Sequence, residues 1–116
     1  MINQLDQLFE DVHLALKQQK YANAMILLRI IGEQWTIWLC DRNHISNKHM
    51  HQRQRLYYLQ QHAILDKNTL RFLQRLQSTG NRAVHQLQAN PQQVIYFLTN
   101  LERYVSRSKQ NYSIYL

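Results

Sequence analysis

The chain has 116 residues and a formal net charge of +7 at pH 7, with two glycines, one proline and one cysteine. This length indicates a single domain. The lone Cys40 excludes an internal disulfide and fits a cytoplasmic protein, as does an acidic amino-terminal sequence that lacks the basic and then apolar pattern of a signal peptide. Because β-branched runs are scarce and Leu, Gln, Arg and Ala are abundant, the composition favours an all-α fold.

The positive charge is unevenly distributed along the chain. Three acidic residues lie in the first predicted helix, whereas beyond Asp41 only Asp66 and Glu102 are acidic, against eleven Lys and Arg residues. Such an imbalance predicts attraction to RNA, DNA or an acidic protein partner. The alternative is that the charge serves solubility alone.

Two helices are predicted at the start of the chain. Residues 3–19 place Leu5 and Phe9 on one face, at the spacing of an amphipathic helix. Residues 21–39 are apolar on every side, which is typical of a helix surrounded by protein, and the run is too short and too interrupted by charge to span a membrane. The short link at 18–20 predicts an antiparallel hairpin in which 21–39 is the central helix of the fold.

Two charged residues interrupt this central helix. Arg29 and Glu33 are four residues apart and therefore share a face. Because buried charges are normally paired, the two side chains are predicted either to tie the central helix to a neighbour or to belong to a site. Trp35 and Trp38, near the end of the same helix, are candidates either for core anchors or for a dimer face.

The stretch at 41–55 lacks helical periodicity in its first part and is interpreted as a loop. It brings His44, His49 and His51 close in sequence to Cys40. These spacings are not a strong zinc signature. The histidines are therefore interpreted as solvated loop side chains, and no metal or other cofactor is predicted.

Three more helices are predicted in the second half of the chain. The first is short, at 55–62, and the second runs from 67 to about 78 behind Asp66, a good N-cap. The last is predicted from 91 to about 106, with Asn90 as its cap and a proline at its first position. These elements predict a small up-and-down bundle of four to five helices over residues 1–108, followed by a C-terminal tail at 109–116.

The second of these helices carries two features of its own. Arg71 and Arg75 lie four apart on one face, a pattern typical of a solvated face and also of a phosphate-binding face. The segment Ser78-Thr79-Gly80-Asn81 is predicted to break the helix, with Gly80 in a left-handed conformation and Asn81 capping a following turn.

Motifs of common enzymes are absent from the sequence: it lacks a glycine-rich phosphate loop, a nucleophile elbow, an H-E-x-x-H motif and paired C-x-x-C motifs. If the chain is an enzyme, its chemistry has to come from Arg75, Asn81, Arg82 and His85, to which Glu33 is an optional addition. A histidine beside an arginine can act as a metal-free ribonuclease, because the imidazole moves a proton and the guanidinium stabilises phosphorane charge.

Two motifs in fixed order resemble a known family. They are Tyr-x-x-Ala…Arg-x-x-x-Glu in the first hairpin and Leu-x-x-x-Gly-Asn-x-Ala-x-His before the closing helix. The matching residues are Tyr21, Ala24, Arg29, Glu33, Leu76, Gly80, Asn81, Ala83 and His85. The pattern is similar to the helical domain at the N-terminus of type I restriction-enzyme R subunits, which also occurs in bacterial and phage-defence proteins. That family is similar to the HEPN superfamily, many members of which are dimeric ribonucleases, and the resemblance covers roughly residues 5–105.

The chain departs from active HEPN ribonucleases, which carry an arginine four to six residues before the histidine. Positions 79–81 hold Thr, Gly and Asn here. The resemblance therefore implies a HEPN-like domain whose ribonuclease centre is missing or altered. In such a domain Gly80 would permit a bend, Asn81 would cap, and His85 would hydrogen-bond back to the central helix near Glu33 or Arg29.

Three functions follow as hypotheses. The favoured one is a non-catalytic, homodimeric HEPN-like module that binds nucleic acid or a partner protein in a bacterial defence or mobile-element context. The second is a HEPN-type ribonuclease toxin that uses His85 and a nearby arginine, and the third is a protein-interaction or inhibitor subunit. The predicted binding residues are Arg29, Glu33, Arg71, Arg75, Asn81, Arg82 and His85, and the candidate catalytic residues among them are Asn81, Arg82 and His85.

Overall fold

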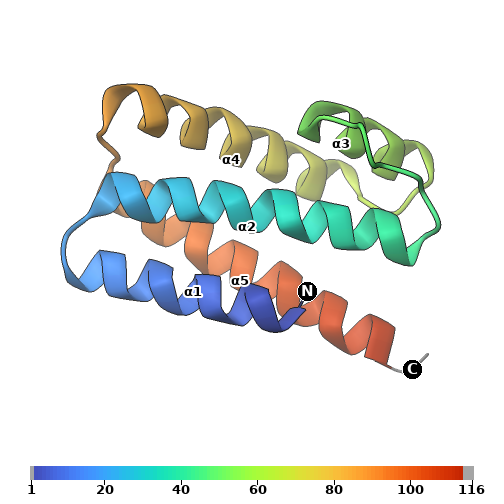
Figure 1. The fold of residues 1–116 in the computed structure, drawn as a ribbon, viewed down its shortest axis with the longest axis horizontal. Coiled ribbons are helices and arrows are strands. Elements are labelled where there is room, and N and C mark those ends of the chain that lie inside the picture. The colour runs from blue at the N-terminus through green and yellow to red at the C-terminus, as the bar shows by residue number, and fades with distance from the viewer. Residues whose placement is uncertain (1, 114–116) are drawn as a thin grey trace.

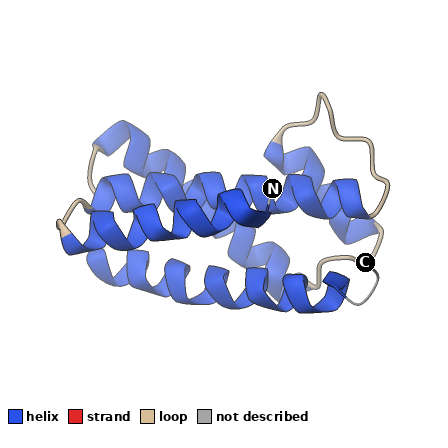
Figure 2. Cartoon of the chain, turned by 60° about the horizontal axis from the view of Figure 1, so that its bottom comes forward, coloured by secondary structure: helices blue, strands red, loops and turns tan. Residues whose placement is uncertain are grey.

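The computed structural model describes residues 2–113, which form five α-helices joined by turns and loops. The helices are α1 (Ile2–Lys17), α2 (Tyr21–Arg42), α3 (Gln52–Gln61), α4 (Lys67–Gln86) and α5 (Pro91–Ser113). The four long helices α1, α2, α4 and α5 run alternately up and down, and the short α3 lies beside α4 at one end of the bundle (Figure 1). All regular structure in the described residues is helical (Figure 2). The predicted all-α bundle is therefore confirmed.

α2 is the central helix, because it contacts each of α1, α3, α4 and α5 (Figure 1). Met25, Leu28 and Ile31 are fully buried, and Leu27, on another side of α2, is half-buried against the same core. A helix enclosed in this way gains most of its stability from burial of apolar surface rather than from helix propensity. None of the helices within residues 2–113 has the length and apolar character needed to cross a bilayer.

Both glycines of the chain lie where α2 and α4 approach each other closely. A Cβ atom built on Gly80 would lie 2.6 Å from Cβ of Arg29, and one built on Gly32 would lie 2.8 Å from Cδ2 of Leu76. The predicted break at 78–81 is wrong: α4 is continuous from Lys67 to Gln86, and no glycine has a positive φ. Gly80 serves close packing of two helices rather than a bend, so Asn81 caps nothing and lies in the helix interior.

The two tryptophans are core residues. Trp35 is 3% exposed and Trp38 is 7% exposed, and the Trp35 ring stacks on Tyr104 of α5 at 6.1 Å between centroids. The indole Nε1 of Trp35 donates a hydrogen bond of 3.0 Å to Oγ of Ser108. The alternative in which the two tryptophans form a dimer face is wrong, because both rings are buried in the core of this chain.

The last helix is longer than predicted, and the predicted boundary between domain and tail falls inside it. α5 continues to Ser113, past the expected end near Ser106. The additional turns are held by the bond from Trp35 to Ser108 and by an ion pair of 2.6 Å between Nζ of Lys109 and Oδ1 of Asp6 on α1. These contacts join residues distant in the sequence, so local periodicity gave no signal of them. Residues 114–116 of the predicted tail lie outside the described residues.

Two predicted caps are confirmed. Oδ1 of Asp66 accepts a 2.7 Å hydrogen bond from the backbone N–H of Thr69 at the start of α4. At the start of α5, Oδ1 of Asn90 accepts a 2.8 Å hydrogen bond from the backbone N–H of Gln92. Each cap satisfies an amide that the first turn of a helix leaves without an intrahelical partner.

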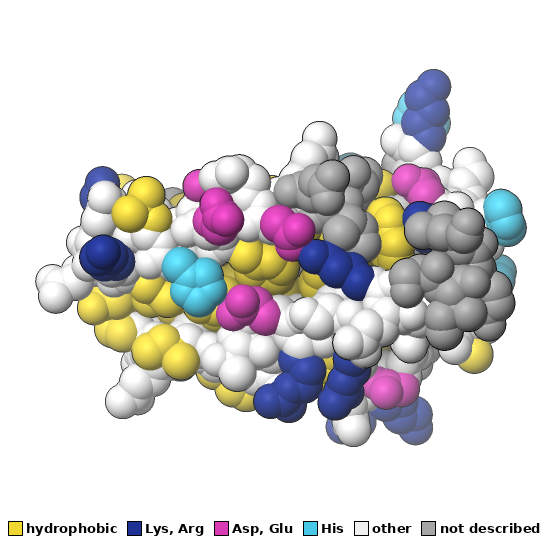
Figure 3. All heavy atoms as spheres, turned by 90° about the horizontal axis from the view of Figure 1, so that it is seen from below, with side chains coloured by type: hydrophobic (Ala, Val, Ile, Leu, Met, Phe, Trp, Pro, Cys, Tyr) yellow, Lys and Arg dark blue, Asp and Glu magenta, His cyan; other side chains and the backbone are white. Residues whose placement is uncertain are grey.

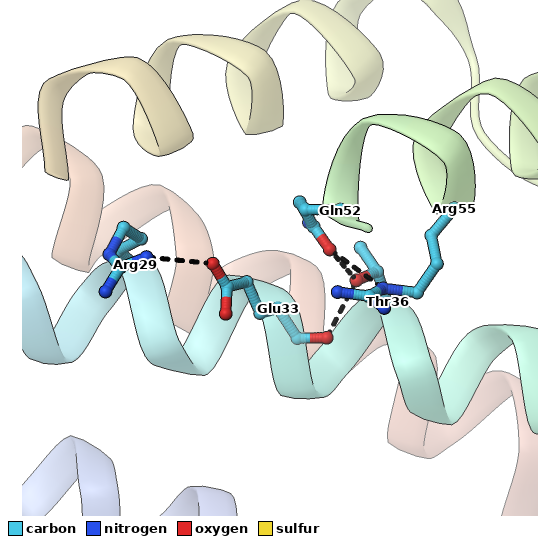
Figure 4. A network of polar contacts seen from close by, with 5 residues as sticks. All are labelled: Arg29, Glu33, Thr36, Gln52 and Arg55. Carbon is cyan, nitrogen blue, oxygen red and sulfur yellow. Dashed lines mark hydrogen bonds and ion pairs between the residues drawn. The ribbon is translucent and has the colours of Figure 1, made fainter. Parts of the chain in front are cut away.

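α3 begins three residues earlier than predicted, and a buried polar network explains its start. The longest connection of the chain, residues 43–51, leads into α3 (Figure 2). Oγ1 of Thr36 on α2 lies 2.7 Å from Oε1 of Gln52, and Nε of Arg55 donates a 3.1 Å bond to the same Oε1 atom (Figure 4). Nη1 of Arg55 also donates a 2.6 Å bond to the backbone O of Met50. The network therefore fastens both the loop and the first turn of α3 to α2.

Candidate functional site

The outer face of α4 carries an exposed stripe of basic and polar side chains. It consists of Arg71, Arg75, Ser78, Arg82 and His85, which are all exposed. At 100° per residue these five positions fall within a sector of about 80°. The predicted pair Arg71 and Arg75 is thus extended by Arg82 and His85 along one straight line, which we call the α4 stripe. The spacing of seven residues between Arg75 and Arg82 was visible in the sequence, but the predicted helix break at 78–81 concealed it.

The electrostatic setting of the stripe is uniformly positive. α4 contains four Lys and Arg residues and no Asp or Glu. The nearest acid in the sequence, Asp66, is the N-cap, and its hydrogen bonds from Thr69 lower the pKa of its carboxyl. Acidic side chains gather instead on α1, and in the view of Figure 3 most of them lie apart from a group of Lys and Arg side chains along one edge. In this view the α1 side therefore carries more acidic side chains than that edge.

A polar groove runs along the stripe on the side of α5. Arg82, Thr79 and Gln93 line one part of it, and Arg75, Gln93 and Tyr96 line the next part. The guanidinium carbon of Arg75 lies 5.9 Å from the centroid of the Tyr96 ring, a cation–π contact between α4 and α5. Nothing in the local sequence marks Tyr96 as a site residue, because only the fold brings it beside Arg75.

A second groove runs along the other side of the stripe, against α3. Arg53 and Leu56 of α3 line it opposite Gln74, Ser78 and Asn81 of α4. The predicted binding residue Asn81 therefore lies beside the stripe and on the wall of this groove. α4 is a ridge with a groove on each flank.

The predicted pair Arg29 and Glu33 lies elsewhere, inside the contact between α2 and α4. Nη1 of Arg29 donates a 3.1 Å hydrogen bond to Oε1 of Glu33 (Figure 4), and the two side chains are 23% and 25% exposed. The aliphatic part of Arg29 lies against Gly80, while its Nε atom is buried without a hydrogen-bond partner. These contacts agree with the structural role considered for the pair, not with a place in the stripe.

The predicted hydrogen bond from His85 to Arg29 or Glu33 is absent. His85 is exposed and makes no hydrogen bond within residues 2–113. The reason is the continuity of α4, which carries His85 onto the outer face, whereas Gly80 points toward α2. Asn81, Arg82 and His85 instead form a surface cluster on the last turns of α4, since positions three and four apart are neighbours on a helix.

The cysteine and the loop histidines are separated by burial. Cys40 is buried, and burial raises the pKa of its thiol. His44, His49 and His51 are exposed. Within the described part of the chain, no three His, Cys, Asp or Glu side chains are arranged to hold a metal ion.

Comparison with known proteins gave no relative of this chain: no protein family matches it, and neither a curated protein nor a solved structure matches it significantly.

Proposed function

We propose that this protein is a non-catalytic, HEPN-like module of the cytoplasm that binds nucleic acid through the α4 stripe. The observation that carries the proposal is an exposed, acid-free line of three arginines and a histidine on one helix. As a homodimer, such a module would act in bacterial defence or mobile-element biology, as the two sequence motifs suggest. The ligand class is argued from charge and geometry, and the biological setting from the resemblance.

The arginines of the stripe are available to a ligand. Arg71 and Arg82 are exposed and form no ion pair with any described residue. Guanidinium groups bind phosphate oxygens through two parallel N–H donors. An exposed arginine that has no acidic partner in the protein can form an ion pair with a phosphate. Contacts between arginine and phosphate release counterions from the nucleic acid.

Removing the charge of the stripe tests its role in binding. The triple variant Arg71→Gln/Arg75→Gln/Arg82→Gln should reduce the steepness of the dependence of log Kd on log salt concentration by about 2 to 3, because each lost phosphate contact removes about 0.9 for duplex DNA or 0.7 for a single strand. The measurement is fluorescence anisotropy with labelled RNA and DNA over a range of salt concentrations.

A matched control has the same loss of charge at another place. Lys17→Gln/Lys20→Gln/Lys48→Gln removes three exposed positive charges outside α4 and should change the salt dependence much less. If both triple variants weaken binding equally, the binding is non-specific attraction to a basic protein. If the wild-type protein binds neither RNA nor DNA at low salt, nucleic-acid binding is refuted, and the alternative of a protein-interaction subunit gains ground.

The ribonuclease alternative has one observation in its favour. Arg82 and His85 are three residues apart on the exposed face of α4, so an imidazole and a guanidinium lie side by side in reach of a substrate. His85 lines neither of the grooves beside α4, so an enclosed centre would need a second subunit. Cleavage of RNA by the wild-type protein, lost in His85→Ala with folding intact, would establish this alternative in place of the non-catalytic one.

A further inference from the structure

The ridge shape of α4 restricts the class of nucleic acid. Gln74 and Asn81 line the groove against α3, while Thr79 and Gln93 line the groove against α5. Between the two grooves the α4 stripe forms a crest. From Arg71 to His85 the crest is about 21 Å long, at 1.5 Å per residue. A convex surface of this kind can enter a groove of a duplex nucleic acid. It does not form a channel that encloses an extended single strand.

We propose that α4 enters the major groove of B-form duplex DNA, an inference that rests on the proposed nucleic-acid binding. An α-helix with its side chains is about 10–12 Å across, and the major groove of B-DNA is about 12 Å wide. The major groove of A-form RNA is deep and too narrow for side chains to read. The major groove of duplex RNA therefore does not accept this crest.

The crest and its flank on the α3 side carry side chains of the types that read base edges. Arg71 and Arg82 can each direct two donors to O6 and N7 of guanine, and Gln74 can pair with N6 and N7 of adenine. All three are exposed and form no hydrogen bond with another described residue. Their polar groups are therefore free to meet bases.

Arginines of the neighbouring helices lie on the flanks of the crest, where the DNA backbone would pass. Arg53 lines the groove on the α3 side. On the other side, Arg103 and Arg107 are exposed on α5, and helical periodicity places them on the same side of α5 as Tyr96, whose ring contacts Arg75. Cations in these places would fix the position on the phosphates, while the crest reads the bases.

Single-stranded nucleic acid fits this surface less well. Proteins that bind single strands stack the bases on open aromatic rings. The crest has no Phe, Tyr or Trp residue, and its one aromatic ring is the imidazole of His85. The ring of Tyr96, on its flank, has the guanidinium of Arg75 5.9 Å from its centroid and the ring of Phe72 at 6.1 Å. Tyr96 is 45% exposed, so this flank offers one ring already contacted by Arg75 rather than a row of open stacking platforms.

The first experiment compares three probes of one sequence at one salt concentration: duplex DNA, the corresponding single-stranded DNA and duplex RNA. Anisotropy should show that duplex DNA binds at least about tenfold more tightly than the other two, which lack an accessible B-form major groove. A duplex whose cytosines carry glucosyl groups in the major groove should bind about tenfold more weakly than the unmodified duplex. A ligand that occupies the minor groove should not compete.

The outcomes separate this inference from the proposed function. Equal or tighter binding of the single strand or of duplex RNA, lost in the triple Gln variant, overturns the major-groove inference and leaves nucleic-acid binding standing. Absence of binding to every probe overturns both. Competition by the minor-groove ligand, without an effect of the glucosyl groups, also overturns the inference.

A charge-preserving variant tests base reading directly. Arg71→Lys/Arg75→Lys/Arg82→Lys keeps the charge of the stripe but replaces the rigid two-donor fork of each guanidinium with a flexible ammonium group. Selection from a random pool of DNA duplexes should enrich a sequence with the wild-type protein and enrich that sequence clearly less with the Lys variant, while the salt dependence stays unchanged. Equal enrichment of the same sequence by both proteins, or of none by the wild type, contradicts base reading by the crest.

Discussion

The inner face of α4 packs against α2 so closely that an added methyl group has no room, whereas the outer face carries long side chains that touch little else. Gly80 and Leu76 belong to the inner face and are buried. Arg71 and Arg82 belong to the outer face and are exposed. Stability therefore depends on the shape of one face of α4, whereas the proposed ligand binding depends on the charge of the other face. Substitutions on the two faces should affect different measurements.

The largest difference is expected between two adjacent residues of α4, one buried and one exposed. Leu73 is 1% exposed and lies in the core, so Leu73→Ala should lower the free energy of unfolding by about 3 kcal/mol through lost burial and the cavity that remains. Gln74→Ala should change it by no more than about 0.5 kcal/mol. Urea denaturation followed by circular dichroism measures both. Equal effects would show that α4 does not pack as described.

A smaller effect is expected from an added methyl group at the contact between α2 and α4. Gly80→Ala should destabilise the fold by about 2 kcal/mol, because the new Cβ would meet Cβ of Arg29, an atom attached to the backbone. Gly32→Ala should cost less, since the atom it meets is the end of the flexible Leu76 side chain. Thermal denaturation compares the two variants. A neutral or stabilising Gly80→Ala would contradict the close approach of the helices, because the gain in helix propensity would then prevail.

The N-cap of α4 should contribute less, and in a pH-dependent way. Asp66→Ala should cost about 1 kcal/mol near pH 7, because the amide of Thr69 loses its acceptor. The folded protein lowers the pKa of Asp66, so the advantage of the carboxylate is complete above the unfolded value of about 3.9 and is lost as the pH falls through the folded value.

A control separates capping from charge. Asp66→Asn keeps an acceptor oxygen that does not titrate, so its stability relative to Asp66→Ala should remain constant between pH 7 and the acid range. Denaturation curves at several pH values test both variants. A difference in stability between wild type and Asp66→Ala that grows on acidification would contradict a lowered pKa of Asp66 in the folded protein.

The smallest effects on stability are expected at Glu33 and His85, which the family resemblance had placed in one hydrogen-bond network. Glu33→Ala should cost about 0.5 kcal/mol, the usual magnitude for a half-buried pair spaced four apart on a helix. His85→Ala should leave the melting temperature unchanged, because the imidazole is exposed and bonded to no described residue. A loss of stability in His85→Ala would restore the predicted network between His85 and α2.

The elements of the fold were predictable where their cause is local. The period of apolar residues predicted all five helices, the all-round apolar character of 21–39 predicted the central position of α2, and Asp66 and Asn90 marked two helix starts. The failures occurred where the cause is a distant partner. Gly80 looks like a helix end because glycine often ends helices, but here Arg29 on α2 requires the absence of a side chain.

The features of the candidate site also fall into those with a local cause, which the sequence predicted, and those with a distant cause, which it did not. The sequence by itself determined which charged residues are available to the site. They are an excess of positive charge in the later helices, a pair of arginines one turn apart, and a histidine beside an arginine. The tertiary structure decided that α4 is unbroken, so that these residues share one exposed line, that Arg29 and Glu33 lie inside the helix contact, and that Tyr96 lies beside Arg75. The physical reason is that periodicity and capping act within a few residues, whereas the close approach of two helices depends on atoms far apart in the chain.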